Sequence, residues 1–381
     1  MADGSVQGVT GEQFAPVREA FEANLASGAD VGASFCATLE GETVVDLWGG
    51  FADAAGAKPW RRDTIVNVYS TTKTMTALAA LLLADRGDLD FDAPVARYWP
   101  EFAANGKAEV KVSHLMAHSA GLSGWKERVT TEDLYDWEKA TALLAAQAPL
   151  WEPGTASGYH AITQGYLVGE VVRRITGRSL GTFFREEIAE PLGADFHIGL
   201  PASEDDRVAE LIPPPPGQGA GDGRQTDIQK ITFNNPVIDV SATKTRSWRG
   251  AEIPAAGGTG NARSVAEIHT ILANGGVAKG KRFMSEAGCR KALELQIEGQ
   301  DLMLSGPARF GMGFGLAGGM LPLPNPDDSM FWGGYGGSLV IIDMKARTTI
   351  AYAMNKMAGT TTGDMRAFGL AMAMWGALGV I

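Results

Sequence analysis

Apolar residues gather into short, strand-like segments near both ends of this chain. Residues 31–37 and 43–48 form two such segments, with Gly41 between them as a turn residue. Residues 338–343 and 348–354 show the same pattern and are joined by Met-Lys-Ala-Arg, which suits a hairpin. The pattern predicts one sheet to which both chain ends contribute.

The middle of the chain has a helical pattern instead. From about residue 112 to residue 196, apolar positions recur at helical spacing between turns that contain Pro or Gly. The four prolines within 212–219 exclude a helix or a central strand, because proline lacks the backbone donor and fixes φ, so we expect a surface loop over a cleft. Helices are expected near residues 131–147, 162–175, 180–188 and 264–274.

These segments together predict an α+β fold, an α/β sandwich. We expect an antiparallel sheet from both chain ends, flanked by helices, with a mostly helical domain inserted between them. The sheet-containing domain would comprise residues 1–75 and 255–381, and the helical domain residues 76–254, with the Pro-rich surface loop near 212–225. An active site is expected in the cleft between the two domains.

One predicted helix differs from the others. It begins at Ser70 and is apolar on nearly every face after its first turn, until it stops at Gly87. An all-round apolar helix is typical of a buried position.

Composition and charge narrow the possible functions. Hydrophobic residues make up 45% of the 381 residues and charged residues 20%, which argues against extensive disorder. The net charge is −11 and no basic stripe is visible, which argues against nucleic-acid binding.

The cysteines and the N-terminus favour a cytoplasmic location. Cys36 and Cys289 are too few and too far apart to be a disulfide framework. The chain does not start with a basic segment followed by an apolar run, so no signal peptide is expected. The longest apolar stretch, at residues 77–84, is too short to span a bilayer, so no membrane role is expected.

Several serines are candidate nucleophiles. Gly177-Arg-Ser179-Leu-Gly181 matches the nucleophile-elbow pattern, and Ser119 lies in a looser version of it. An elbow needs a strand before the serine and a helix after it. Ser179 instead follows an amphipathic helix, and Ser119 runs into a turn-rich segment, so both are interpreted as loop serines.

The pattern Ser-x-x-Lys occurs at Ser70, Ser123 and Ser241. Its chemistry needs both residues on one helix face, with the serine at the N-terminus, where free N–H groups favour negative charge. Only Ser70 begins a buried helix. An exposed Lys73 would make Ser70 a simple N-cap, but the segment beyond Lys73 is almost wholly apolar. A lysine removed from water has a lowered pKa and can accept a proton near neutral pH.

These residues resemble a known family. Tyr69-Ser-Thr-Thr-Lys73 and the helix after it are similar to the first motif of class C β-lactamases, D-Ala-D-Ala carboxypeptidases and family VIII carboxylesterases, which share the β-lactamase/transpeptidase-like fold. The segments Asp90–Pro100 and His114–Leu122 follow in the family's order. Gly158-Tyr159-His160 resembles the tyrosine motif, and Trp332-Gly333-Gly334-Tyr335 resembles the third motif.

The resemblance implies an acyl-enzyme mechanism. Ser70 would be the nucleophile, Lys73 and Tyr159 would share its proton, and Lys73 would favour the Tyr159 phenolate. Which of the two is the formal base is left open. The resemblance also implies that the backbone N–H groups of Ser70 and Tyr335 hold the oxyanion. Candidate substrate-binding residues are Trp332, Gly333, Gly334, Tyr69, His160 and Trp125. For Trp125, packing in the core is an equal alternative.

Two departures from the family pattern point to neutral esters. Penicillin-recognising members carry an Asn where this chain has Ala161, and a Lys or His where it has Trp332. A site without the amide and the cation should prefer neutral substrates, so we expect a carboxylesterase for small or medium esters. A β-lactamase or D-amino-acid peptidase is the alternative, and a non-catalytic penicillin-binding-like protein is a further one.

No cofactor or metal is expected. His114 and His118 have the i, i+4 spacing of two ligands on a helix, but no third ligand accompanies them. The expected partner is a small-molecule ester, and the sequence does not indicate the oligomeric state.

Overall fold

A computed structural model describes residues 4–217, 225–304 and 306–381 of the chain. Its main element is a nine-stranded antiparallel sheet with strand order β1-β3-β2-β14-β13-β12-β11-β10-β9. These strands are β1 (Gln7–Thr10), β2 (Gly32–Leu39), β3 (Glu42–Gly50), β9 (Ile297–Gln300), β10 (Pro307–Phe310), β11 (Gly315–Leu316), β12 (Ser329–Gly333), β13 (Leu339–Asp343) and β14 (Thr348–Met354).

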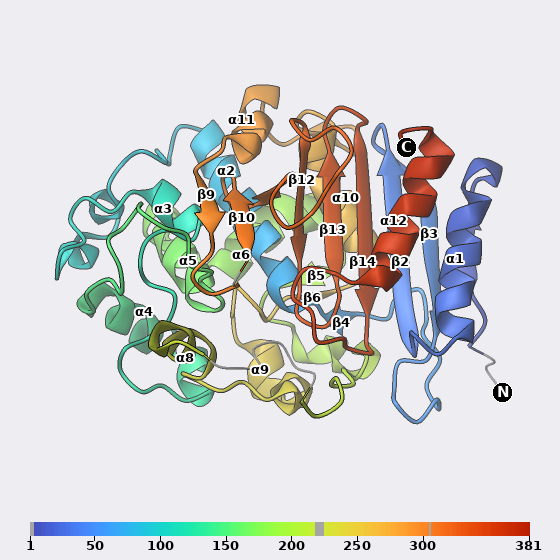
Figure 1. Ribbon diagram of the computed structural model, residues 1–381, viewed down its shortest axis with the longest axis horizontal. Helices are drawn as coiled ribbons and strands as arrows, with labels where there is room; N and C mark the ends of the chain where they lie inside the picture. The colour runs from blue at the N-terminus through green and yellow to red at the C-terminus, as the bar shows by residue number, and fades with distance from the viewer. Residues whose placement is uncertain (1–3, 218–224, 305) are drawn as a thin grey trace.

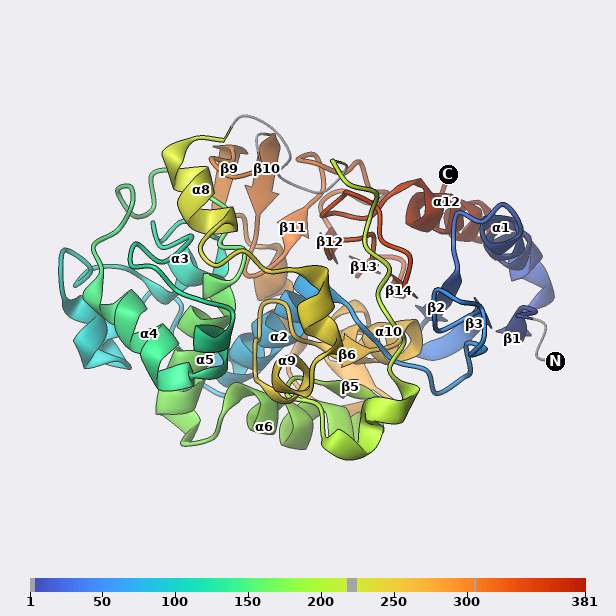
Figure 2. The same cartoon turned by 90° about the horizontal axis from the view of Figure 1, so that it is seen from below.

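Both chain ends build this sheet, which confirms the predicted fold class. The N-terminal strand β2 pairs with the C-terminal strand β14, with Ile350 opposite Ala37. The β13–β14 hairpin also forms as expected. All seven residues of β14 are buried, because helices cover both faces of the sheet at this point. Figures 1 and 2 show α1 and α12 side by side on one face and α10 on the other.

Helices surround the sheet and fill the middle of the chain (Figure 1). They are α1 (Ala15–Ala26), α2 (Thr72–Asp85), α3 (Val112–Met116), α4 (Trp137–Ala146), α5 (Thr163–Thr176), α6 (Leu180–Phe184), α7 (Glu190–Leu192), α8 (Asp227–Phe233), α9 (Arg246–Gly250), α10 (Ala262–Ala273), α11 (Glu286–Arg290) and α12 (Met365–Leu378). The chain also forms two small sheets. One has three strands, β4 (Val66–Asn67), β5 (Phe196–His197) and β6 (Thr259–Gly260), and the other has two, β7 (Val277–Ala278) and β8 (Lys281–Arg282).

Two of the predicted helices are less regular than expected. The single helix expected at 131–147 is interrupted at Asp136, which has extended backbone angles and caps α4 by accepting a hydrogen bond from Lys139 N. A short 3₁₀ turn precedes it. The helix expected at 180–188 is α6 followed by a π-helical turn, Arg185–Ala189. At Asp136, a capping side chain therefore divides a segment that the apolar pattern predicts as one helix.

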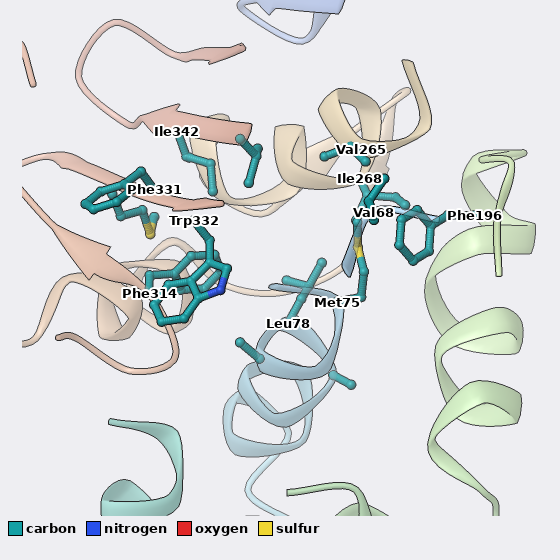
Figure 3. Close-up of a cluster of buried hydrophobic side chains, with 14 of the residues drawn as sticks. Val68, Met75, Leu78, Phe196, Val265, Ile268, Phe314, Phe331, Trp332 and Ile342 are labelled. Atoms are coloured by element: carbon teal, nitrogen blue, oxygen red, sulfur yellow. The ribbon is translucent and has the colours of Figure 1, made fainter. Parts of the chain in front are cut away.

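The helix predicted to be buried lies at the centre of the molecule. Twelve of the fourteen residues of α2 are buried. In Figure 3, Met75 and Leu78 of α2 lie in one cluster with Val265 and Ile268 of α10 and with Trp332 of the sheet. This cluster holds α2 against the sheet, which brings its N-terminus beside strand β12.

The Pro-rich loop can be followed in part. Ile212 forms an isolated bridge with Lys356, and Pro213, Pro215, Pro216 and Gly217 are exposed, as expected of a surface loop. Residues 218–224 lie outside the described residues, so the expected cover over a cleft stays a prediction. None of the helices in the described ranges is long and apolar enough to cross a bilayer.

Candidate active site

Ser70 lies in a tight turn at the N-terminal end of α2. The turn Tyr69–Thr71 is 3₁₀-helical and α2 continues from Thr72. Tyr69 has a φ of 44°, in the left-handed region that a bulky residue rarely adopts. Such strain is tolerated only where the surroundings fix the backbone, and here it turns the chain immediately before Ser70.

Lys73 reaches Ser70 from one turn deeper in α2. Its Nζ lies 3.1 Å from Ser70 Oγ. The same Nζ donates to two backbone carbonyls, Ala161 O at 2.7 Å and Ala255 O at 3.0 Å. Ala161 precedes α5 and Ala255 lies between α9 and β6, so three distant segments meet at this amine.

The environment of Lys73 favours the neutral amine. The residue has no exposed surface, and burial lowers the pKa of Lys73 well below its usual value. Taking an ammonium out of water is costly unless a carboxylate accompanies it, and the two carbonyls of Ala161 and Ala255 carry no charge. A lysine whose pKa is lowered in this way can accept a proton from the Ser70 hydroxyl.

Tyr159 also contacts Ser70. Its phenol oxygen donates to Ser70 Oγ at 2.5 Å, and Lys73 Nζ lies 4.8 Å from the centre of its ring. Burial raises the pKa of the Tyr159 phenol above its usual value, although the hydrogen bond to Ser70 lowers it. Burial thus works against the phenolate expected at Tyr159, and it outweighs the hydrogen bond to Ser70 in its effect on the pKa.

The third motif lies against the backbone that precedes Ser70. Ser338 Oγ donates to Val68 O at 2.9 Å and is 2.9 Å from Thr71 Oγ1. A side chain at Gly334 would put a Cβ 2.1 Å from Val68 O, so only glycine allows this approach. These contacts fix the loop that contains Tyr335 beside the nucleophile, while the role of the two N–H groups as an oxyanion hole stays a prediction.

An uncharged pocket adjoins Tyr159. Its free volume is about 10 Å³, close to the minimum that one water molecule needs. Its walls are Tyr159, Leu304, Met320, Phe331, Trp332, Gly333, Thr361 and Thr362. Trp332 and Gly333 are thus beside the candidate centre, and Trp332 gives the third motif an uncharged indole.

His118, which no sequence motif places in the site, packs against Trp332 and Tyr159. The ring of His118 stacks on Trp332 at 5.3 Å between ring centres and is 5.1 Å from the Tyr159 ring. Burial lowers the pKa of His118 well below its usual value, so the wall behind Trp332 is uncharged. His118 lies beyond the end of α3 with a φ of 58°, so it does not share a helix face with His114.

Two expected substrate contacts are wrong. His160 has no exposed surface, and its ring nitrogens are paired with Gly158 O and Leu122 N. Trp125 is also buried and donates its indole N–H to Ala140 O. Both side chains point into the protein. Tyr69 packs its ring on Tyr335, at 5.5 Å between ring centres, next to the nucleophile.

The other candidate serines have structural partners. Ser179 caps α6 and donates to Glu252. Ser123 Oγ is 2.7 Å from Thr232 Oγ1. Lys244, the lysine that follows Ser241, is paired with Glu210. Of the three Ser-x-x-Lys sequences, the structure brings together the pair at Ser70 and Lys73. In the described part of the chain, no three His, Cys, Asp or Glu side chains are grouped as metal ligands would be.

Comparisons with known proteins agree with this fold. The beta-lactamase family model matches residues 17–372. The Esterase/beta-lactamase LipL of Mycobacterium tuberculosis is 35% identical over 92% of this chain and 83% of its own length. A crystal structure of a family VIII carboxylesterase superimposes with a TM-score of 0.93 at 46% identity, covering 98% of this chain and all of its own. A penicillin-binding protein homologue from Caulobacter crescentus has a TM-score of 0.91 at 40% identity, with 98% of this chain and all of its own covered.

Proposed function

This chain belongs to the beta-lactamase family of serine hydrolases, and from that membership and the geometry around Ser70 we propose that it is a carboxylesterase with a Ser70 acyl-enzyme. The observation that carries the proposal is the approach of Lys73 Nζ and Tyr159 Oη to the same oxygen, Ser70 Oγ. The names of the carboxylesterase and esterase relatives support an ester as the substrate.

Lys73 is the base in the first step. A neutral amine has two N–H bonds, which the carbonyls of Ala161 and Ala255 accept, so its lone pair faces the Ser70 hydroxyl. Ser70 Oγ attacks the ester carbonyl carbon while its proton moves to Lys73 Nζ. The new C–O bond turns the carbonyl oxygen into an oxyanion.

Tyr159 is the acid that releases the alcohol. Because its phenol keeps a proton, Tyr159 can donate that proton to the leaving oxygen as the ester C–O bond breaks. The Lys73 ammonium then returns a proton to the phenolate, and the acyl group remains on Ser70. Water adds to the acyl-enzyme by the reverse sequence, so that Ser70 leaves with a proton and the carboxylic acid is released.

The oxyanion is held by the backbone N–H groups of Ser70 and Tyr335. The contacts of Ser338 and Gly334 with Val68 support this assignment, because they fix the two segments against each other. Donors fixed in advance stabilise a developing charge without reorganisation, and removing one costs on the order of 3 kcal/mol in serine hydrolases.

The substrate is a neutral ester of small to medium size. The pocket beside Tyr159 has no charged residue in its walls, and Trp332 and Ala161 replace the cation and the amide of the penicillin-recognising relatives. An anionic substrate would lose its hydration in this pocket without gaining a counter-charge.

Ester and β-lactam hydrolysis can be compared directly on the purified enzyme. We expect p-nitrophenyl butyrate to be hydrolysed with a kcat/KM at least about a hundredfold above that for nitrocefin, since nitrocefin carries a carboxylate that this pocket does not pair. The alternative, a β-lactamase, is favoured by the name of LipL, which states both activities. A clear preference for nitrocefin would establish that alternative and reject the esterase.

A further inference from the structure

We propose that Asp301 is a positioning residue for the Tyr159 acid, holding the backbone of Tyr159 so that its phenol proton is directed at the leaving group. This inference rests on the proposed function, because it assigns a role relative to Tyr159 as the acid. Asp301 belongs to no motif in the sequence, and it is 142 residues from Tyr159 along the chain.

One carboxylate oxygen of Asp301 accepts three backbone hydrogen bonds. Asp301 Oδ1 accepts hydrogen bonds from Tyr159 N at 3.1 Å, Met303 N at 2.8 Å and Leu304 N at 2.9 Å. The segment is tied a second time, because Leu302 N donates to Ser157 O at 2.9 Å. The carboxylate therefore joins the Tyr159 backbone to a loop whose Leu304 is a wall of the pocket.

The other side of the tyrosine segment is held by His118. Gly158 N donates to His118 O at 2.9 Å, and His160 N donates to His118 Nδ1 at 3.1 Å. Tyr159 N lies between these two donors in sequence, and its acceptor is Asp301. Three consecutive N–H groups are thus fixed, which leaves the phenol little freedom relative to Ser70.

The burial of Asp301 makes this arrangement costly, which argues against an incidental contact. Only 3% of the residue is exposed. Its second oxygen, Oδ2, is buried and has no hydrogen-bond partner among the described residues. Hydrogen bonds to a charged acceptor contribute more than neutral ones, and three on one oxygen offset part of the desolvation of the carboxylate.

The charge of Asp301 also acts on the phenol. The ionisable groups around Tyr159 are Lys73 from α2, the histidine pair His118 and His160, and Asp301. Burial keeps both histidines neutral by lowering their pKa values. The negative charge of Asp301 adds to burial in raising the pKa of Tyr159. Both influences keep the proton on the phenol until the leaving group takes it.

The test uses two esters of the same acid that differ in their need for an acid catalyst. Ethyl butyrate releases a basic alkoxide, which requires a proton, whereas p-nitrophenyl butyrate releases a stable phenolate. In Asp301→Ala we expect kcat/KM for ethyl butyrate to fall about a hundredfold, as a displaced acid would cause. The fall for p-nitrophenyl butyrate should be less than about tenfold. Asp301→Asn keeps an acceptor oxygen but removes the charge, so its ethyl butyrate activity should lie between those of Asp301→Ala and the wild type.

Asp343→Asn is the matched control. Asp343 is also a buried carboxylate, 4% exposed, and accepts a hydrogen bond from Ala346 N at the far end of β13. Its replacement should lower the thermal unfolding temperature without changing the ratio of the two esters. If Asp301→Ala lowers both esters equally at an equal folded fraction, the inference is overturned. If Tyr159→Phe also fails to discriminate between the esters, the acid role of Tyr159 fails and this inference fails with it. The proposed esterase function fails separately, if the wild-type enzyme prefers nitrocefin to p-nitrophenyl butyrate.

Discussion

Lys73→Met is expected to lower ester hydrolysis by about 10⁴-fold or more while the protein stays folded. Methionine is unbranched and has a similar volume, but its thioether sulfur is too weak a base to take the Ser70 proton. The variant keeps the apolar burial of α2 and loses the three contacts of Nζ, with Ser70 Oγ, Ala161 O and Ala255 O. kcat/KM for p-nitrophenyl butyrate, measured beside a circular dichroism spectrum, checks both parts of this expectation.

The chain offers a matched control for this substitution. Lys107 is a second lysine without exposed surface, and its Nζ donates to Ala104 O at 2.7 Å and Ala145 O at 2.9 Å. Burial lowers its pKa to about 8. Lys107→Met makes the same chemical change away from Ser70, so it should cost stability and leave kcat/KM near the wild-type value. Equal activity losses in both variants would mean that the loss at Lys73 is structural.

The wild-type pH dependence follows from the same assignment. Only the neutral amine accepts a proton, so kcat/KM should fall as the pH drops through the pKa of Lys73. Burial places that pKa well below the usual value for lysine. In a plot of kcat/KM against pH, the rise should therefore occur at a pH well below the usual pKa of lysine.

Tyr159→Phe should lower kcat/KM for ethyl butyrate by about 10²- to 10⁴-fold, the range expected when a general acid is removed. The variant loses only the hydroxyl that donates to Ser70 Oγ at 2.5 Å, and the backbone contacts of the segment with Asp301 and His118 remain. The loss for p-nitrophenyl butyrate should be at least about tenfold smaller, because its leaving group needs no proton. Parallel steady-state measurements on the two esters give this ratio. Equal losses for both esters would assign Tyr159 to the attack by Ser70 instead.

The parts of the site that lie close together in sequence were predicted from the sequence. Ser70 and Lys73 are one helical turn apart, so the period of the helix is enough to bring them together, and the apolar pattern of α2 indicated that the lysine is buried. Tyr159 required the family resemblance, since no local pattern relates it to α2. The sheet from both chain ends was likewise predicted, because its strands have strongly apolar segments.

The errors and omissions arise where only the tertiary structure decides. His160 is expected in the substrate site because it adjoins Tyr159, and Trp125 as an apolar wall, but their ring nitrogens are used inside the protein. Asp301 and His118 were missed as parts of the site, because their contacts with the tyrosine segment join distant parts of the chain. The phenolate expected at Tyr159 is disfavoured by burial, which raises the pKa of the phenol and which the sequence around Tyr159 does not reveal.

Labelling the active enzyme with a fluorophosphonate, followed by peptide mass mapping, tests the central assignment of Ser70 most directly. We expect one adduct per chain, on the peptide that contains Ser70, with loss of esterase activity in proportion to labelling. Pre-incubation with butyrate esters should slow the labelling. An adduct on Ser119 or Ser179, or full activity in a protein without a Ser70 adduct after complete reaction, would contradict it.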